Sequence, residues 1–274
     1  MNTLKKMILL IPLFMLVNST FACFIMFLTD GTRILIGNHE DWYARDAEVT
    51  FVPPSQNKMG MLYFDFASEG TPQGGMNSAG LFFDGTRTPN ASYPDNLHKL
   101  DCKCYIWKKI LAECSTVEQA ISYVTRYKIP EIEDVHILFA DKQGHSAIVG
   151  VYNKTLHVYR NTHQYQLLTN FNIANPSYGG EAPCPRFAAA DSLLRLDSTV
   201  SIPNVEKILS FTNQDDLTIY SNIYDLKAGD VYVYSVYTRN NFTNKVRLNL
   251  AIELKIGAHA VSIRHLFGLP PLVN

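Results

Sequence analysis

Cys23 is the residue of this chain best suited to covalent chemistry. It directly follows a segment typical of a secretion signal, with a short basic start, the apolar residues 7–17, and small residues at Thr20 and Ala22. Cleavage after Ala22 would make Cys23 the new amino terminus. Its α-amine would then have a pKa of about 7.7 to 8.0, so it could accept the proton of the thiol on the same residue.

A carboxylate near that α-amine would orient it and tune its pKa, and Asp41 is the expected carboxylate. The dipeptide Asp30-Gly31 between two apolar runs predicts a β-hairpin. Because the start of one strand faces the end of its antiparallel partner, the hairpin brings Cys23 close to residues 38–41.

The remaining elements come in blocks. Strands are expected at residues 61–66 and 80–85, helices at 102–113 and 116–126, four strands within 135–171, helices at 185–196 and 205–211, strands at 216–225, 230–236 and 246–254, and a terminal helix at 259–267. A capping box of Ser115 and Glu118 would begin the second helix. Helices in consecutive blocks favour the α+β class with antiparallel sheets over a doubly wound parallel sheet. We interpret residues 1–22 as a signal peptide and residues 23–274 as a single domain.

Composition excludes several kinds of partner. Removing the two lysines of the leader takes the formal charge from −1 to −3, so nothing favours binding to nucleic acid. After the leader, the chain has no apolar stretch of about 18 residues, the length that predicts a transmembrane helix. The Cys-Lys-Cys sequence lacks the second ligand pair of a zinc site, and we expect neither a metal nor a cofactor.

The five cysteines are an odd number, so at least one must stay unpaired in an oxidising compartment. If Cys23 is free, the sequence leaves open how the other four pair. These four are Cys102, Cys104, Cys114 and Cys184.

The opening CFIMFLTDGTRILIGNHEDW (residues 23–42) resembles that of the choloylglycine hydrolase and penicillin V acylase group of amino-terminal-nucleophile hydrolases. Members of this group begin with cysteine, turn at Asp-Gly and reach a Gly-Arg-Asn-x-Asp motif, which corresponds here to residues 37–41. The segment GGMNSAGLFFDG (residues 74–85) resembles the family's GMNExGL segment. LLTNFN (residues 167–172), PRFAAADSLL and YSNIYDLKAGDVYVY resemble later family segments.

The resemblance implies a four-layer αββα sandwich, with two stacked, mainly antiparallel sheets and helices outside. It implies Cys23 as the nucleophile, Asp41 as the orienting carboxylate, and Asn170 as a contact of the oxyanion or the amine. The implied reaction is hydrolysis of a linear, non-peptide C–N amide through an acyl-thioester on Cys23. The substrate would be a small acylated amine or amino-acid conjugate of the penicillin V or bile-salt-like class.

The chain departs from the family pattern beside the nucleophile. Asn38 stands where the family has arginine and offers only neutral hydrogen bonds, roughly half as strong as charged ones. His39 replaces the family asparagine, and the oxyanion donor falls near Thr86 or Arg87. We therefore regard four residues as possible substrate or oxyanion contacts: Asn38, His39, Asn77 and Arg87. Apolar residues that could line an acyl pocket are Phe27, Trp42, Phe64 and Phe82.

Other interpretations remain open. Arg186 could pair with a buried acid or cap a helix, and a contact with the substrate is the less favoured interpretation. Lipidation of Cys23 would acylate its amine and alkylate its sulfur, giving a membrane-anchored module without catalysis. Transfer of the acyl group to an amine would make the chain an acyl-transferase, and Asn38 could mark an inactive member. In the favoured interpretation the protein is exported to the periplasm or the exterior, touches a membrane only if lipidated, and could form oligomers.

Overall fold

The computed structural model describes residues 23–175, 184–235, 242 and 244–270. The expected signal peptide, residues 1–22, lies outside these ranges. Within them, every helix is too short or too polar to cross a bilayer.

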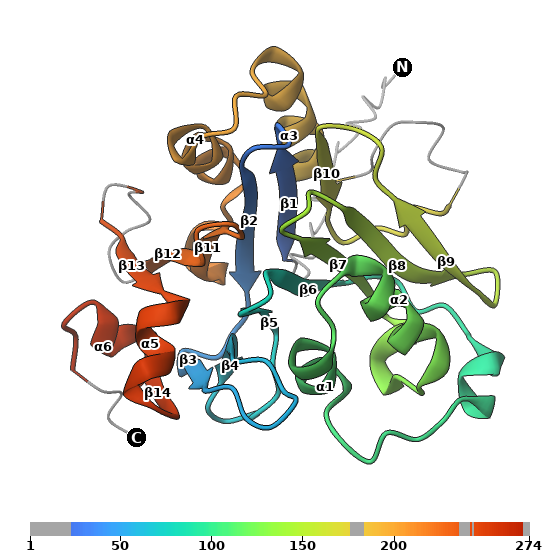
Figure 1. Ribbon diagram of the computed structural model, residues 1–274. Coiled ribbons are helices and arrows are strands. Elements are labelled where there is room, and N and C mark those ends of the chain that lie inside the picture. Colours follow the sequence, from blue (N-terminus) through green and yellow to red (C-terminus); the bar gives the residue numbers. More distant parts are fainter. Residues whose placement is uncertain (1–22, 176–183, 236–241, 243, 271–274) are drawn as a thin grey trace, which may run out of the picture.

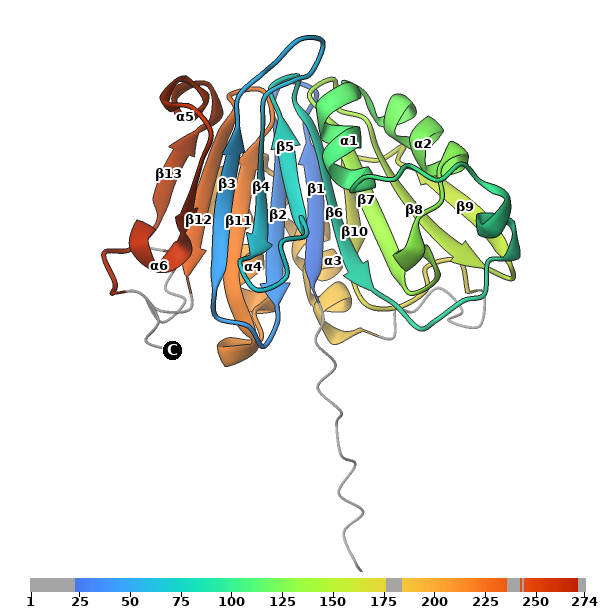
Figure 2. The same ribbon diagram turned by 90° about the horizontal axis from the view of Figure 1, so that it is seen from below.

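Two antiparallel sheets form the centre of the molecule (Figures 1 and 2). The six-stranded sheet contains, in spatial order, β10 (Tyr165–Leu168), β1 (Phe24–Thr29), β2 (Ile34–Asp41), β11 (Thr218–Asp225), β12 (Asp230–Ser235) and β13 (Val246–Asn249). The eight-stranded sheet contains β14 (His259–Ser262), β3 (Ala47–Val52), β4 (Met61–Phe66), β5 (Gly74–Asn77), β6 (Leu81–Arg87), β7 (Val135–Asp141), β8 (Ser146–Tyr152) and β9 (Thr155–Arg160).

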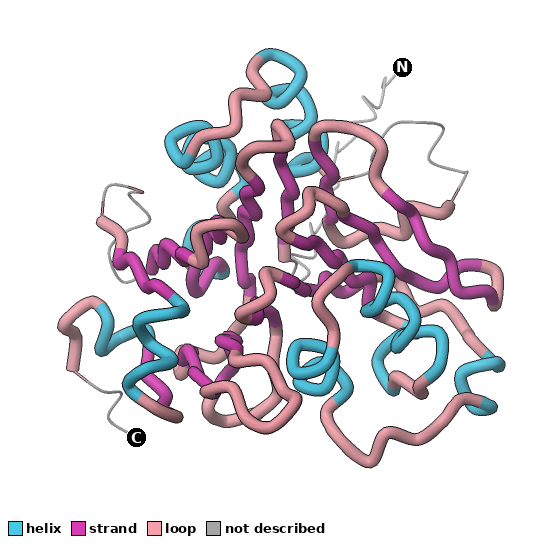
Figure 3. The backbone as a smooth tube through the Cα atoms, in the orientation of Figure 1, coloured by secondary structure: helices cyan, strands magenta, loops and turns pink. Residues whose placement is uncertain are grey.

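Helices cover the outer faces of both sheets (Figure 3). The six-stranded sheet is covered by α3 (Pro185–Leu196) and α4 (Ile202–Thr212), and the eight-stranded sheet by α1 (Ile106–Glu113) and α2 (Val117–Arg126). The two remaining α-helices, α5 (Leu250–Ile256) and α6 (Ile263–Leu266), lie beside β3. Short 3-10 helices span Pro94–His98, Pro130–Glu133 and Asp215–Leu217. This is the expected αββα sandwich.

The central strands β1, β2, β4 and β11 are buried on both faces, so their apolar side chains point to both sides of the sheet. In β1, Ile25 and Phe27 pack into the core between the sheets, while Phe24 and Met26 pack into the core beneath α3 and α4. Side chains on β2 alternate in the same way, which decides where its polar end residues point.

The hairpin of β1 and β2 and the bounds of α3 agree with the sequence prediction. Two predictions near the carboxyl terminus are wrong. Residues 246–254 were expected as one strand, but Asn249 ends β13 and caps α5 by accepting a hydrogen bond from the Ile252 N–H at 3.2 Å. Residues 259–267 were expected as a helix, but β14 occupies the first four, and the Ser262 side chain caps a helix that begins at Ile263.

The start of α2 also differs from expectation. Its N-cap is Thr116, whose side chain accepts a hydrogen bond from the Gln119 N–H at 3.3 Å. Ser115 instead donates from its N–H and its hydroxyl to the Gln119 side chain. The helix therefore begins one residue later than the capping-box pattern predicts.

Gly74 in β5 lies opposite Asp84 in β6, and a Cβ at Gly74 would overlap the Asp84 carboxyl. We predict that Gly74→Ala lowers the free energy of unfolding by about 1–3 kcal/mol, the usual cost of overpacking. In an Asp84→Ala background, which removes most of the overlap, the same change should cost less than half as much. Urea unfolding of the four proteins checks this, and an equal cost in both backgrounds would contradict it.

Candidate active site

The register of the first hairpin places Cys23 opposite Glu40. Phe24 pairs with His39 and Ile25 pairs with Asn38, so the next pair outward is Cys23 and Glu40. Side chains of directly opposed residues share one face of a sheet. Accordingly, Cys23 Sγ lies 3.4 Å from Glu40 Oε1, and both residues line the same cavity.

Asp41 is the next residue along β2, and its side chain points to the opposite face, toward the layer of α3 and α4. Its carboxylate accepts hydrogen bonds from Arg186 Nη1 at 2.6 Å and Gln214 Nε2 at 2.8 Å. A β-bulge in β11 sets Thr218 opposite Asp41, and the Thr218 hydroxyl also donates to this carboxylate. Burial raises the pKa of Asp41, while the Arg186 charge and these hydrogen bonds oppose that shift.

Arg186, near the start of α3, connects the predicted residues to one another. Its Nη2 donates to the backbone carbonyl of Cys23 at 3.2 Å and to Asn170 Oδ1 at 3.0 Å. The Asn170 amide in turn donates to the backbone carbonyl of Arg87 at 2.8 Å. Cys23, Asp41 and Asn170 therefore meet around one guanidinium, and the expectation that Arg186 pairs with a buried acid is confirmed.

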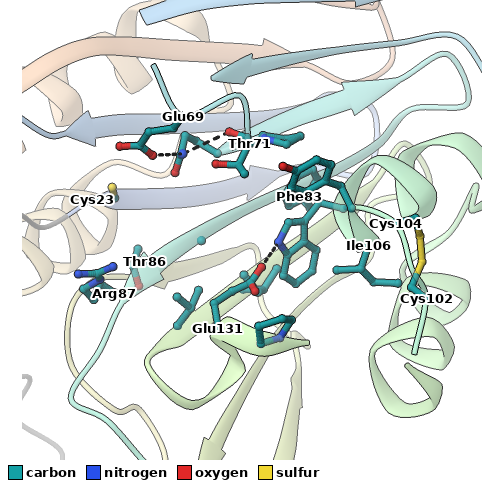
Figure 4. Close-up of a pocket in the computed structure, with 18 of the residues that line it drawn as sticks. Cys23, Glu69, Thr71, Phe83, Thr86, Arg87, Cys102, Cys104, Ile106 and Glu131 are labelled. Atoms are coloured by element: carbon teal, nitrogen blue, oxygen red, sulfur yellow. Dashed lines mark hydrogen bonds between the residues drawn. A yellow bond between two sulfur atoms is a disulfide. The ribbon is translucent and has the colours of Figure 1, made fainter. Parts of the chain in front are cut away.

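A cavity of about 680 Å³ opens from the Cys23 sulfur between the sheet edge and the loops around α1 (Figure 4). One wall is aromatic, because Phe83 stacks on Trp107 with ring centroids 5.4 Å apart. Trp42 also lines the cavity. The indole N–H of Trp42 donates to Glu69 at 2.9 Å and that of Trp107 to Glu131 at 2.5 Å, so both rings are held in place.

The far end of the cavity carries the Cys102–Cys104 disulfide (Figure 4). Cys23, Cys114 and Cys184 are free, which answers the pairing question that the sequence leaves open. Within the described ranges, no group of three or more histidine, cysteine or acidic side chains is arranged to hold a metal ion.

Acidic groups dominate the electrostatics around the sulfur. Burial, followed by the nearby Glu40, Asp41 and Asp84 carboxyls, raises the pKa of the Cys23 thiol, whereas the backbone N–H of Asp41 lowers it. Burial raises the pKa of Glu40 to about 8. Burial and the neighbouring Glu40 also raise the pKa of Asp84. The Cys23 sulfur thus lies among carboxyls that tend to keep their protons.

Three of the possible contact residues lie away from the cavity. Asn38 is buried between the sheets and donates to Asp84 at 2.7 Å. His39 points to the other face of β2, where Nδ1 is 2.7 Å from the Ser221 hydroxyl and Nε2 is 2.9 Å from the Leu209 carbonyl in α4. Asn77 donates to the carbonyls of Leu111 and Cys114, both at 2.7 Å, and so fixes α1 on the sheet.

The structure therefore places none of these three side chains in the cavity lining, and their contact with a substrate stays a prediction. Arg87 and Thr86 do line the cavity near Cys23 (Figure 4). The Arg87 guanidinium lies over the Trp42 ring at 5.8 Å. Of the apolar candidates, Trp42 reaches the cavity, while Phe27, Phe64 and Phe82 belong to the core between the sheets.

Glu40 lies beside the Cys23 sulfur, and the sequence analysis gave it no role of its own. It occupies the variable position of the Gly-Arg-Asn-x-Asp motif, so the resemblance assigns it no role. The signal that could have found it is the length of the hairpin turn, because Asp30 and the three residues after it set the register.

Comparison with known proteins places this geometry in context. Residues 30–179 match the family model of the acyl-coenzyme A:6-aminopenicillanic acid acyl-transferases. Penicillin V acylase from Agrobacterium tumefaciens superposes with a TM-score of 0.66 at 16% identity, covering 88% of this chain and 90% of that one. A mutant conjugated bile acid hydrolase from Clostridium perfringens gives 0.65 at 17% identity, covering 88% and 96%.

A Caenorhabditis elegans orthologue of N-acylethanolamine-hydrolyzing acid amidase gives a TM-score of 0.56 at 15% identity, covering 74% of this chain and 93% of that one. No curated protein sequence matches the chain. The expected amino-terminal-nucleophile hydrolase fold is confirmed.

The ion pair between Arg186 and Asp41 yields a stability prediction. Arg186→Met should lower the free energy of unfolding by about 3–5 kcal/mol, because it leaves a buried carboxylate without its cation. A double variant with Asp41→Asn should lose less than the sum of the two single losses. Arg195→Met, which breaks an exposed ion pair with Asp191 on the same helix, should cost at most about 1 kcal/mol.

Chemical denaturation of these variants measures the four differences. Losses at Arg186 and Asp41 that simply add would show that the two side chains do not act as a pair.

Proposed function

Because the chain belongs to the acyl-coenzyme A:6-aminopenicillanic acid acyl-transferase family, we propose that it is an exported cysteine amidase that cleaves a linear, non-peptide C–N bond. The observation that carries this proposal is the position of Cys23. Its sulfur lies at one end of the 680 Å³ cavity, beside a carboxyl group and a backbone N–H. A substrate amide could reach the sulfur from that cavity.

The reaction follows the chemistry of a cysteine nucleophile. Removal of residues 1–22 would free an α-amine on the carbon that bears the thiol side chain, giving a proton acceptor within the same residue. The thiolate attacks the amide carbon, the C–N bond breaks, and the acyl group remains on Cys23 as a thioester. Water then releases the acid.

The residues around Cys23 support this sequence of steps by fixing its geometry. The Arg186 guanidinium donates hydrogen bonds to the Cys23 backbone carbonyl at 3.2 Å and to the Asp41 carboxylate at 2.6 Å. These two contacts fix the backbone of Cys23 relative to β2. The backbone N–H of Asp41 lowers the pKa of the Cys23 thiol, so it favours the thiolate that attacks the amide.

The cavity favours an apolar acyl group of substantial size. The stacked pair of Phe83 and Trp107, together with Trp42, offers a flat aromatic surface. The charged residues that line the cavity carry both signs, and the acidic ones outnumber the basic ones. They are Glu40, Asp41, Glu69, Asp101, Glu131, Arg87, Lys103 and Lys128.

Acyl transfer is the second candidate function, favoured by the name of the matching family. It uses the same thioester and differs only in the acceptor, an amine in place of water. Lipidation of Cys23 would abolish both reactions, because it would block the sulfur and the amine.

The test uses mature protein whose intact mass establishes an unmodified Cys23 at the amino terminus. Release of amine should be measured with penicillin V, a conjugated bile acid and an N-acylethanolamine, followed by a panel of aromatic and short aliphatic acyl amides. We expect activity on at least one aromatic acyl amide, and we expect Cys23→Ala to lower it at least 10³-fold, the scale seen when a nucleophile is removed.

Cys114→Ala serves as the matched control, since this free cysteine is buried beneath α1 and lies outside the cavity. It should retain activity. A diacylglycerol mass on Cys23, or undiminished turnover by Cys23→Ala, would refute the proposal. Products that incorporate an added amine would select acyl transfer over hydrolysis.

A further inference from the structure

We propose that Glu40, 3.4 Å from the Cys23 sulfur, accepts the thiol proton and returns it to the leaving nitrogen. This inference rests on the proposed function and adds a catalytic group to it. The reaction described above uses only the α-amine as proton acceptor, and the family resemblance assigns Glu40 no role.

Two strand ladders hold Glu40 against the sulfur. The β1–β2 register sets it opposite Cys23, and the bulge in β11 sets Tyr220 opposite it on the other side. Glu40 is 3% exposed, so its side chain has no alternative position in solvent. Among the described residues, its carboxyl is the one side chain that hydrogen-bonds the Cys23 sulfur.

Titratable groups from several elements act on Glu40. They are Cys23 from the start of β1, Glu69 from the loop after β4, Asp84 from β6, Tyr220 and Tyr224 from β11, and Asp41, which acts through its charge from the opposite face of β2. Burial acts first, and the charges of Asp41 and Glu69 add to it, to raise the pKa of Glu40 to about 8.

The fraction of Glu40 that can accept the thiol proton rises with pH. A carboxyl whose pKa is raised to about 8 is mostly protonated at pH 6 and mostly ionised at pH 9. Only the ionised form can accept a proton from the thiol. The Cys23 thiol and the Glu40 carboxyl are close enough to titrate as a pair. After the pair loses its first proton near pH 8, the remaining proton can move between the sulfur and the carboxyl oxygen.

The protons balance over the full reaction. The Glu40 carboxylate takes the thiol proton as the sulfur bonds to the amide carbon, and it donates that proton to nitrogen as the C–N bond breaks. In the second half, Glu40 takes a proton from the attacking water and returns it to the sulfur as the C–S bond breaks. The sum is amide plus water giving acid plus amine, with Glu40 unchanged.

The test measures sulfur reactivity without any substrate. Iodoacetamide alkylation of Cys23 in the mature protein, followed by mass spectrometry from pH 6 to 10, should show an inflection near pH 8. Glu40→Gln, which keeps the shape of the side chain, should lose that inflection. Glu40→Asp should keep it at a lower rate. Glu118→Gln, an exposed residue that pairs with Arg160, is the control and should match the wild type.

Turnover supplies the second readout. Glu40→Gln should lower kcat/KM at least 100-fold, within the usual range for general acid–base groups, and Glu40→Asp should recover part of the loss. An inflection and a kcat/KM that both persist in a folded Glu40→Gln protein would overturn the inference and leave the α-amine as the acceptor. Failure of the wild type on every amide, with the alkylation result intact, would refute the proposed function while supporting proton exchange between the two residues.

Discussion

The antiparallel register between β1 and β2 is the constraint on which the site depends. It fixes Cys23 opposite Glu40 and leaves Asp41 one residue farther along the same strand. Since neighbouring side chains of a strand point to opposite faces, these two acids act in different layers. Glu40 meets the sulfur inside the cavity, and Asp41 meets Arg186 beneath the helices.

This division explains how one short strand end can serve two purposes. On the helix side, the ion pair of Asp41 and Arg186 ties α3 to the backbone of Cys23, so the covering helix fixes the start of β1. On the cavity side, the carboxyls of Glu40 and Asp84 occupy a buried region where charge is costly. The ion pair thus fixes the backbone of Cys23, and the acidic region surrounds its sulfur.

Much of the fold could be predicted from the sequence because strand and helix periodicities are local signals, but the register could not. A two-residue turn at Asp30-Gly31 would have paired Cys23 with Asn38. The actual turn has four residues, because the Asp30 side chain accepts hydrogen bonds from the N–H groups of Thr32 and Arg33, at 2.8 and 2.7 Å. That shift of two positions replaces Asn38 by Glu40 at the sulfur. The contact between Asp41 and Arg186 spans 145 positions and depends on tertiary packing that no local pattern encodes.

The most direct test of this account is to identify the atom that carries the acyl group during turnover. Mature protein mixed with its best aromatic amide should be quenched in acid within the first turnover and digested for peptide mass mapping. We predict one acyl group on the peptide that begins with Cys23, removable by neutral hydroxylamine as a thioester. An acyl group on another residue, or turnover with Cys23 unmodified at every quench time, would contradict the account.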